Sequence, residues 1–121
     1  MVGGRSVAGR LRGTDGGCGV RLYLAVLDTL TAGERIAQAA HAVTEMAVGH
    51  REAFREWRDG ANIVVVVVMD ARALETLLMT ATLAGDAVVA FCEPDRGGER
   101  TAVAVFPSAG TLRLLRRATL A

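Results

Sequence analysis

The sequence of 121 residues contains no lysine, so all 14 of its basic side chains are arginines. Aromatic residues are scarce, at 4% of the chain, and there are only two prolines. Because 13 acidic residues leave a formal net charge of only +1, the composition argues against a protein that binds nucleic acid through its overall charge. Any basic surface must therefore be local.

Long apolar runs are also missing. The longest, residues 63–69, is far shorter than the roughly 20 residues that a membrane-spanning helix needs. The first 20 residues are broken by glycines and lack the apolar core of a signal peptide, which predicts a cytoplasmic protein. Cys18 and Cys92 lie far apart without metal-ligand spacing. We therefore expect free thiols, no metal site and no cofactor.

The chain divides into two parts by composition. Residues 1–19 are rich in Gly and Arg and show no periodicity, so they are predicted to form a disordered tail. Residues 20–121 carry periodic apolar patterns throughout and are predicted to form one domain with one core.

Apolar and β-branched runs predict strands over residues 21–28, 62–70, 86–92 and 100–107. The second run has no polar alternation, which is typical of a central strand buried on both faces. The last two runs flank a turn over residues 93–99 and together predict a β-hairpin.

Helices are predicted to begin near residue 32 and to span residues 51–59, 71–84 and 109–121. Thr31 and Glu34 have the spacing of a capping box at the start of the first helix. Asp70 and Ser108 are predicted N-caps of the last two helices, and Gly85 is a predicted C-terminal stop. The order β-α-α-β-α-β-β-α predicts an α/β fold, a three-layer α/β/α sandwich with a mixed four-stranded sheet.

The first helix carries an unusual line of polar residues. On a 3.6-residue period Glu34, Gln38, His41 and Glu45 fall within one narrow stripe. His41 could belong to a functional site, or it could simply pair with Glu45 one turn further along.

Three separated segments resemble type 2 peptidyl-tRNA hydrolases: GERIAQAAHA (33–42), FREWRDGANIVVVVV (54–68) and EPDRGGERTAVAVFPS (93–108). The resemblance extends from about residue 21 to the C-terminus. It implies a small cytosolic α/β/α domain, often a homodimer, that acts in translation. The reaction it implies is hydrolysis of the ester between the peptide and the 3′ ribose of peptidyl-tRNA.

The same resemblance assigns candidate site residues. Gln38 and His41 match the family's Gln and His, Thr101 fits the threonine before the last strand, and either Asp95 or Glu93 fits its acidic residue. Attack by water on an ester requires a base and hydrogen-bond donors for the oxyanion. We interpret Asp95 as the candidate base or water-orienting group, with Thr101 and Gln38 as donors. The turn that carries Asp95 could instead be only a solvated hairpin turn.

The sequence departs from the family at one position, because Glu34 stands where the family has a lysine. Arg35 is adjacent, but one helical step turns a side chain by about 100°. Arg100 is therefore a further candidate for the catalytic cation. The charge reversal leaves two hypotheses open: a slow hydrolase, or a catalytically lapsed relative that binds tRNA or protein.

Arginines supply the candidate tRNA contacts. Arg113, Arg116 and Arg117 lie on the last helix without acidic neighbours in sequence, and Arg35 lies beside the expected site. A third hypothesis is an unrelated α/β domain that binds a small molecule. Such a domain would need a pocket elsewhere than between the first helix and the hairpin turn.

Overall fold

The computed structural model describes residues 20–121, so the predicted disordered tail and Cys18 lie outside the described residues. The strands are β1 (Arg21–Leu27), β2 (Ile63–Met69), β3 (Ala87–Glu93), β4 (Glu99–Phe106) and β5 (Thr119–Leu120). The helices are α2 (Ala32–Gly49), α3 (Arg51–Asp59), α4 (Ala71–Ala84) and α5 (Ala109–Arg116), with a 3₁₀ turn, η1 (Pro94–Arg96), between β3 and β4. No helix among these residues is long and apolar enough to cross a membrane.

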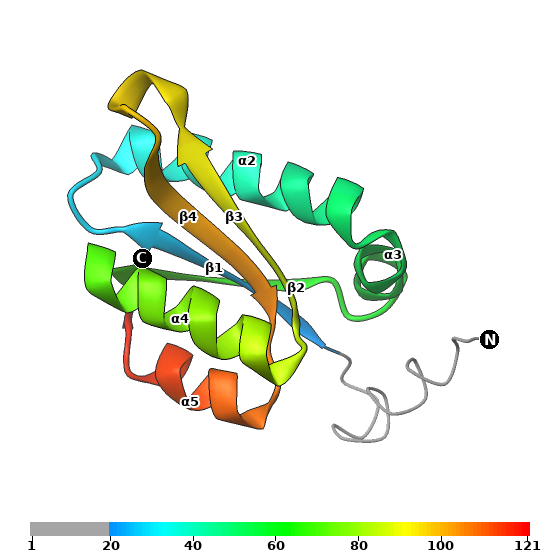
Figure 1. Cartoon of the computed structure of the whole chain (residues 1–121). Coiled ribbons are helices and arrows are strands. Elements are labelled where there is room, and N and C mark those ends of the chain that lie inside the picture. The colour runs from blue at the N-terminus through cyan, green and yellow to red at the C-terminus, as the bar shows by residue number, and fades with distance from the viewer. Residues whose placement is uncertain (1–19) are drawn as a thin grey trace.

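The predicted α/β class and mixed sheet are confirmed, but the sheet has five strands rather than four, in the order β3-β4-β1-β2-β5 (Figure 1). The final helix ends at Arg116, well before the predicted residue 121. Residues 119–120 instead pair antiparallel with residues 67–68 of β2. The Ala121 amide also donates to the Val66 carbonyl at 2.9 Å. The chain end thus satisfies backbone groups that would otherwise form an open sheet edge.

The prediction that residues 62–70 form a central strand buried on both faces is wrong. Ile63 and Val64 remain 38% and 44% exposed, because only the two-residue β5 flanks β2 on that side. The centre of the sheet is instead β1, which pairs parallel with β2 and antiparallel with β4. Residues 22–27 of β1 and 101–106 of β4 are buried along their whole length.

Helices cover both faces of the sheet and form two cores. The first core packs α2 and α3 on one face through Ala42, Met46 and Trp57. The second packs α4 and α5 on the other face, with Leu74 and Leu77 at its centre. Since α2 follows β1 and α4 follows the parallel β2, both helices begin at the same end of the sheet, where these two strands stop (Figure 1).

The predicted helix caps are mostly confirmed. The Glu34 amide donates to Thr31 Oγ1 at 3.2 Å, and the Thr31 amide donates to Glu34 Oε1 at 2.8 Å, which completes the capping box. Asp70 Oδ1 accepts a bond of 2.8 Å from the Ala73 amide at the start of α4. Gly85 ends α4 with a φ of 80°, a left-handed conformation that glycine adopts without a steric penalty.

Ser108 stands at the predicted N-cap position of α5 but does not cap the helix with its side chain. Its amide and hydroxyl both donate to Asp86 Oδ2, at 3.2 Å each, and the hydroxyl of the buried Thr111 donates to the same oxygen at 2.6 Å. Asp86 therefore joins the start of β3 to α5, and the serine serves this tertiary contact instead.

Candidate active site

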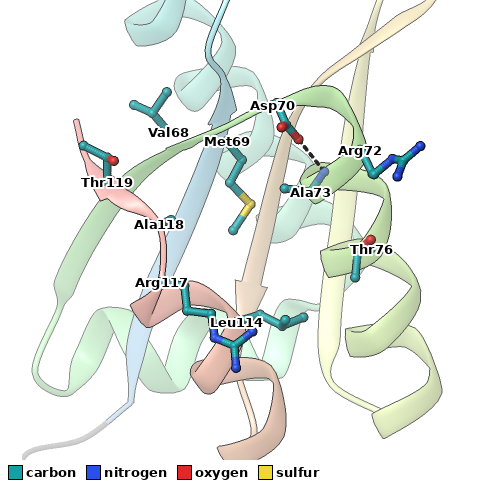
Figure 2. Close-up of a pocket in the computed structure, with 10 residues that line it drawn as sticks. All are labelled: Val68, Met69, Asp70, Arg72, Ala73, Thr76, Leu114, Arg117, Ala118 and Thr119. Carbon is teal, nitrogen blue, oxygen red and sulfur yellow. Dashed lines mark hydrogen bonds between the residues drawn. The ribbon is translucent and has the colours of Figure 1, made fainter.

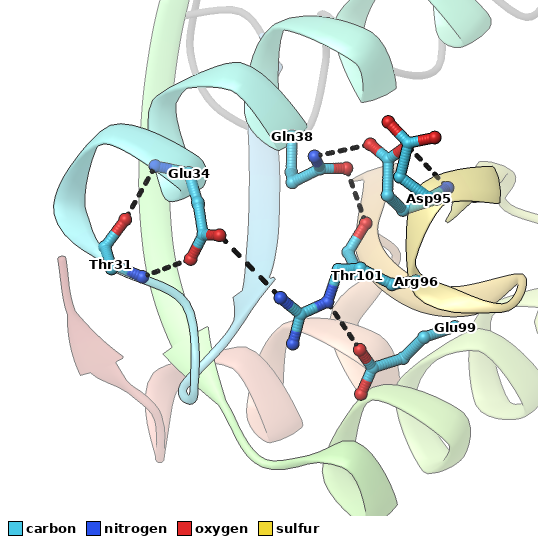
Figure 3. A network of polar contacts seen from close by, with 8 residues as sticks. Thr31, Glu34, Gln38, Asp95, Arg96, Glu99 and Thr101 are labelled. Atoms are coloured by element: carbon cyan, nitrogen blue, oxygen red, sulfur yellow. Dashed lines mark hydrogen bonds and ion pairs between the residues drawn. The ribbon is translucent and has the colours of Figure 1, made fainter.

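Four elements meet where the first turns of α2 face the end of β3, the turn η1 and the start of β4 (Figure 3). Within residues 20–121 the buried polar side chains are Gln38, Thr101 and Thr111. Buried polar groups need hydrogen-bond partners, because an unpaired one loses its bonds to water without compensation. Gln38 and Thr101 find their partners here, although they lie 63 residues apart in sequence.

Gln38 stands at the centre of a hydrogen-bonded row. Thr101 Oγ1 donates to Gln38 Oε1 at 2.6 Å, and Gln38 Nε2 donates to Glu93 Oε2 at 2.8 Å. A carboxylate only accepts, so the amide nitrogen of Gln38 must face Glu93 and its oxygen must face the threonine. We call these three residues the Gln38 network. Each bond fixes the next, and the row ends on a carboxylate at the protein surface.

A one-residue irregularity in the hairpin places Thr101 in this row. Phe91 pairs with Ala102, whereas the next residue of β3, Cys92, pairs with Arg100, so Thr101 is the extra residue of a β-bulge. Ala102 lies in the core beneath α2. Strict alternation would therefore direct Thr101 away from α2, and the bulge reverses this direction.

Glu93, rather than Asp95, contacts Gln38. The pKa of Glu93 lies below its ordinary value, chiefly because Gln38 donates to the carboxylate and further because the Asp95 backbone amide donates to it at 3.3 Å. Glu93 is therefore ionised at neutral pH. Asp95 lies beside it on η1 and is exposed. The sequence alone did not decide which of the two acids contacts Gln38, because they are two residues apart and the same short turn carries both close to α2.

His41 also faces the hairpin. Its ring stacks on Phe91, with centroids 4.4 Å apart and an angle of 12° between the planes. Phe91 lies two residues before Glu93, and the positive charge of a protonated His41 favours the ionised form of that carboxyl group. No ion pair or hydrogen bond joins His41 to Glu45 within the described part of the chain. The histidine is therefore held by the aromatic ring of β3.

Arg96, on the turn η1, is a cation at this site that sequence reasoning missed. Its Nε donates to Glu99 Oε1 at 2.7 Å, and its guanidinium lies 3.7 Å from Glu34 Oε2 (Figure 3). The bond from Arg96 to Glu99 raises the pKa of the arginine further, and Glu93 adds to this effect. The i, i+3 spacing of Arg96 and Glu99 was a weak sign of their contact. Nothing in the sequence places Arg96 beside Glu34.

Arg100 and Arg35, the two cations named from sequence, have other partners. Arg100 pairs with Glu75 on α4, so it reaches the opposite face of the sheet from the Gln38 network. Arg35 lies in the first turn of α2, and its side chain donates to the Asp28 carbonyl at 3.0 Å. Neither guanidinium contacts the network.

The remaining predicted arginines lie on α5 and just after it. Arg113, Arg116 and Arg117 are exposed on the α4 face of the sheet, and none forms an ion pair with residues 20–121. The structure does not bring them to the Gln38 network. The same part of the chain contains no group of three or more His, Cys, Asp or Glu side chains able to hold a metal ion. Cys92 is a free, exposed thiol.

Comparison with protein families gives one match. The family model described as peptidyl-tRNA hydrolase PTH2 matches residues 20–112, which include every member of the Gln38 network. Comparison with curated proteins finds no match. The family match covers most of the chain and shows that the chain belongs to this family.

Proposed function

We propose that this member of the peptidyl-tRNA hydrolase PTH2 family hydrolyses the ester between the peptide and the 3′ ribose of peptidyl-tRNA, in the cytoplasm. The Gln38 network is the observation that carries the proposal. It joins three of the residues matched to the family, from α2, β3 and β4, in one hydrogen-bonded row that ends on an ionised carboxylate.

Glu93 is the candidate base in this mechanism. A water molecule attacks the ester carbonyl carbon while its proton passes to the Glu93 carboxylate. The tetrahedral intermediate then collapses, the bond to the 3′ ribose oxygen breaks, and that oxygen takes the proton that Glu93 received, which returns Glu93 to its ionised form. Gln38 donates to Oε2 of Glu93 and the Asp95 amide donates to Oε1, so both oxygens are held in place and each keeps acceptor capacity for the water.

Thr101 has a positioning role. Its side chain is fully buried, so its hydroxyl orients the Gln38 amide and does not contact substrate. His41 is exposed beside Glu93 and can donate to the leaving oxygen or to the peptide. The assignment of Thr101 as an oxyanion donor is thereby replaced by an indirect role.

Arg96 supplies the positive charge for the developing oxyanion. It is partly exposed, and Glu34 and Glu99 hold its guanidinium on two sides. Glu34 is therefore a capping residue whose charge is offset by this arginine. A preorganised cation near the carbonyl oxygen stabilises the charge that appears in the transition state.

The alternative function is a relative that binds tRNA or protein without cleaving the ester. The observation that favours it is the carboxylate of Glu34 at the rim of the site, where it competes for the charge of Arg96. Turnover of purified peptidyl-tRNA by the wild-type chain separates the two. Release of peptide that is lost in Glu93→Gln supports the hydrolase, and tRNA binding without release supports the alternative.

Binding of tRNA is assigned to exposed arginines. Arg35 lies at the edge of the site, whereas Arg113, Arg116 and Arg117 extend the contact to the other face of the domain. Each arginine that neutralises a phosphate makes binding more sensitive to salt. Replacing Arg113 and Arg116 with alanine should lower the slope of log affinity against log salt by roughly one per lost contact. An unchanged slope would remove α5 from the interface.

A homodimer is proposed on the exposed face of α2. Ile36 and Val48 are 73% and 67% exposed there, and the exposed Ala40 between them permits close approach of a second backbone. Light scattering should give twice the 12.7 kDa mass of the chain, and Ile36→Glu should restore that of the monomer. A monomeric wild type at micromolar concentration would contradict this.

A further inference from the structure

A pocket of about 460 Å³ lies between the first turns of α4 and the segment that joins α5 to β5 (Figure 2). Met69, Leu114 and Ala118 contribute to its apolar lining. Its volume falls in the range of about 300–1,000 Å³ that is typical of small-molecule sites. The pocket lies on the α4 face of the sheet, whereas the Gln38 network lies on the α2 face, so the two are separate sites.

The topology of the sheet places this pocket next to a position where ligands commonly bind. β1 and β2 are adjacent and parallel, but the helix after β1 covers one face and the helix after β2 covers the other. In open α/β sheets, the crevice outside the carboxyl ends of two such strands is the usual ligand site. The pocket opens at the carboxyl end of β2, next to Met69 and Asp70, and no residue of β1 lines it, so it lies beside this crevice rather than in it.

Two arginines of the pocket have no anionic partner in the described part of the chain. Arg72 and Arg117 both line it and are exposed, and neither forms an ion pair with residues 20–121. Arg96, beside the Gln38 network, is paired with Glu99, and Arg100 is paired with Glu75 on α4. Guanidinium groups bind phosphate oxygens through directed, charge-assisted hydrogen bonds. The pocket therefore has the charge to hold a phosphate.

The rest of the rim contains acceptors and hydroxyls as well as cations. Asp70 Oδ1 caps α4 through the Ala73 amide, while Oδ2 makes no hydrogen bond with the described residues and can accept one from a ligand. Thr76 and Thr119 add two hydroxyl groups. A simple aliphatic acid has no donor for Asp70, whereas a sugar has several. The lining therefore suits a sugar phosphate attached to an apolar or planar body.

We infer that this pocket binds a nucleoside phosphate. Arg117 holds the phosphate, Asp70 accepts from a ribose hydroxyl, and the base lies against Met69 and Leu114. Arg72 points away from Arg117 at the other end of the pocket (Figure 2) and adds positive charge at the rim. The ligand has two sources: a free nucleotide, or the single-stranded 3′ end of an RNA. The second source rests on the proposed function, because peptidyl-tRNA carries the ester at such an end. The first source does not.

The first experiment titrates adenosine 5′-monophosphate into the full chain and follows backbone amide shifts by NMR. We expect a Kd of about 1 mM or tighter, with shifts concentrated in residues 68–76 and 114–119. Arg117→Ala should weaken binding at least ten-fold, and Arg72→Ala should weaken it less. Arg51→Ala is the control, since it removes an exposed arginine of α3 that does not line the pocket, and it should leave the Kd unchanged. Absence of binding at about 10 mM, or equal loss in the control, would overturn the inference.

The second experiment separates the parts of the ligand. Adenosine and inorganic phosphate should each bind at least ten-fold more weakly than the monophosphate, and equal binding of either would overturn the nucleoside phosphate assignment. A short single-stranded RNA with a free 3′ hydroxyl should compete if the RNA end is the source. Competition by free nucleotides alone supports the first source.

Failure of the proposed function gives a different result from failure of this site. Glu93→Gln should abolish turnover and leave the Kd for the monophosphate unchanged, because it lies on the other face of the sheet. A wild-type chain without hydrolase activity that still binds the monophosphate supports the pocket alone. Turnover without nucleotide binding overturns the pocket and leaves the proposed hydrolase intact.

Discussion

Charged side chains on the two faces of the sheet differ in their partners at the end of the sheet where α2 and α4 begin. On the α2 face, Glu93 and Arg96 each have two side-chain or backbone partners within the protein. On the α4 face, Arg72 and Arg117 line a pocket without an ion-pair partner in residues 20–121. The contrast fits the hydrolysis proposed for one face and the ligand binding proposed for the other. A reacting group must be held in one geometry before substrate arrives, whereas a cation that binds an anion must be available to it.

The largest effect is expected from removal of the Glu93 charge. Glu93→Gln keeps the size of the side chain but cannot accept a proton from water, so kcat for peptidyl-tRNA should fall by about 100-fold or more. Asp95→Asn is the matched control on the same turn and should change kcat by less than about three-fold, within the range of indirect effects. Steady-state kinetics checks both. A larger loss in Asp95→Asn would move the base to Asp95.

The second test concerns the cation. Arg96→Ala should lower kcat by about ten-fold, because the oxyanion loses its nearest positive charge. Adding Glu34→Lys in that background should restore part of the rate, since it returns a cation from the first turn of α2. The double variant should also melt at a slightly lower temperature, because the capping bond to the Thr31 amide is lost. If the double variant showed no recovery of rate, the proposal that Arg96 acts through its positive charge would be contradicted.

A smaller effect is expected from two buried hydroxyls, one on each face. Thr101→Val leaves Gln38 Oε1 without its donor, and Thr111→Val removes the shortest of three hydrogen bonds to Asp86 Oδ2, so each should cost about 1–3 kcal/mol of unfolding free energy. Only Thr101→Val should lower kcat, by several-fold, because only Thr101 orients Gln38. Denaturant unfolding and kinetics check the pair. Equal kinetic effects would reduce Thr101 to a structural role.

The smallest effect is a shift of the acid limb of the pH profile. The pKa of Glu93 is lowered in the folded protein, so the carboxylate stays ionised above that value and gains a proton only as pH falls through it. Activity should therefore persist from neutral pH to below 4.5, the ordinary value for this group, unless the fold is lost first. In Thr101→Val the limb should move upward, because a looser Gln38 stabilises the ionised form less. An acid limb that does not move would contradict the coupling through Gln38.

Local signals in the sequence determined most of the elements. Thr31 with Glu34, Asp70 and Gly85 marked helix ends correctly, because caps depend on residues three or four positions apart. The apolar runs likewise predicted four of the five strands. The family resemblance then predicted a site on the first helix and the hairpin, and the Gln38 network joins residues of both.

Only the tertiary structure decided which side chains meet there. The direction of Thr101 depends on a bulge, which is a property of two paired strands and leaves no mark in either one. The choice of Glu93 over Asp95, and the pairing of Arg96 with Glu34, depend on how a short turn lies against a helix more than 50 residues away in sequence. The two-residue β5 pairs with β2 and satisfies backbone groups at its edge. This pairing depends on β2, so the pattern of residues 109–121 alone does not predict it.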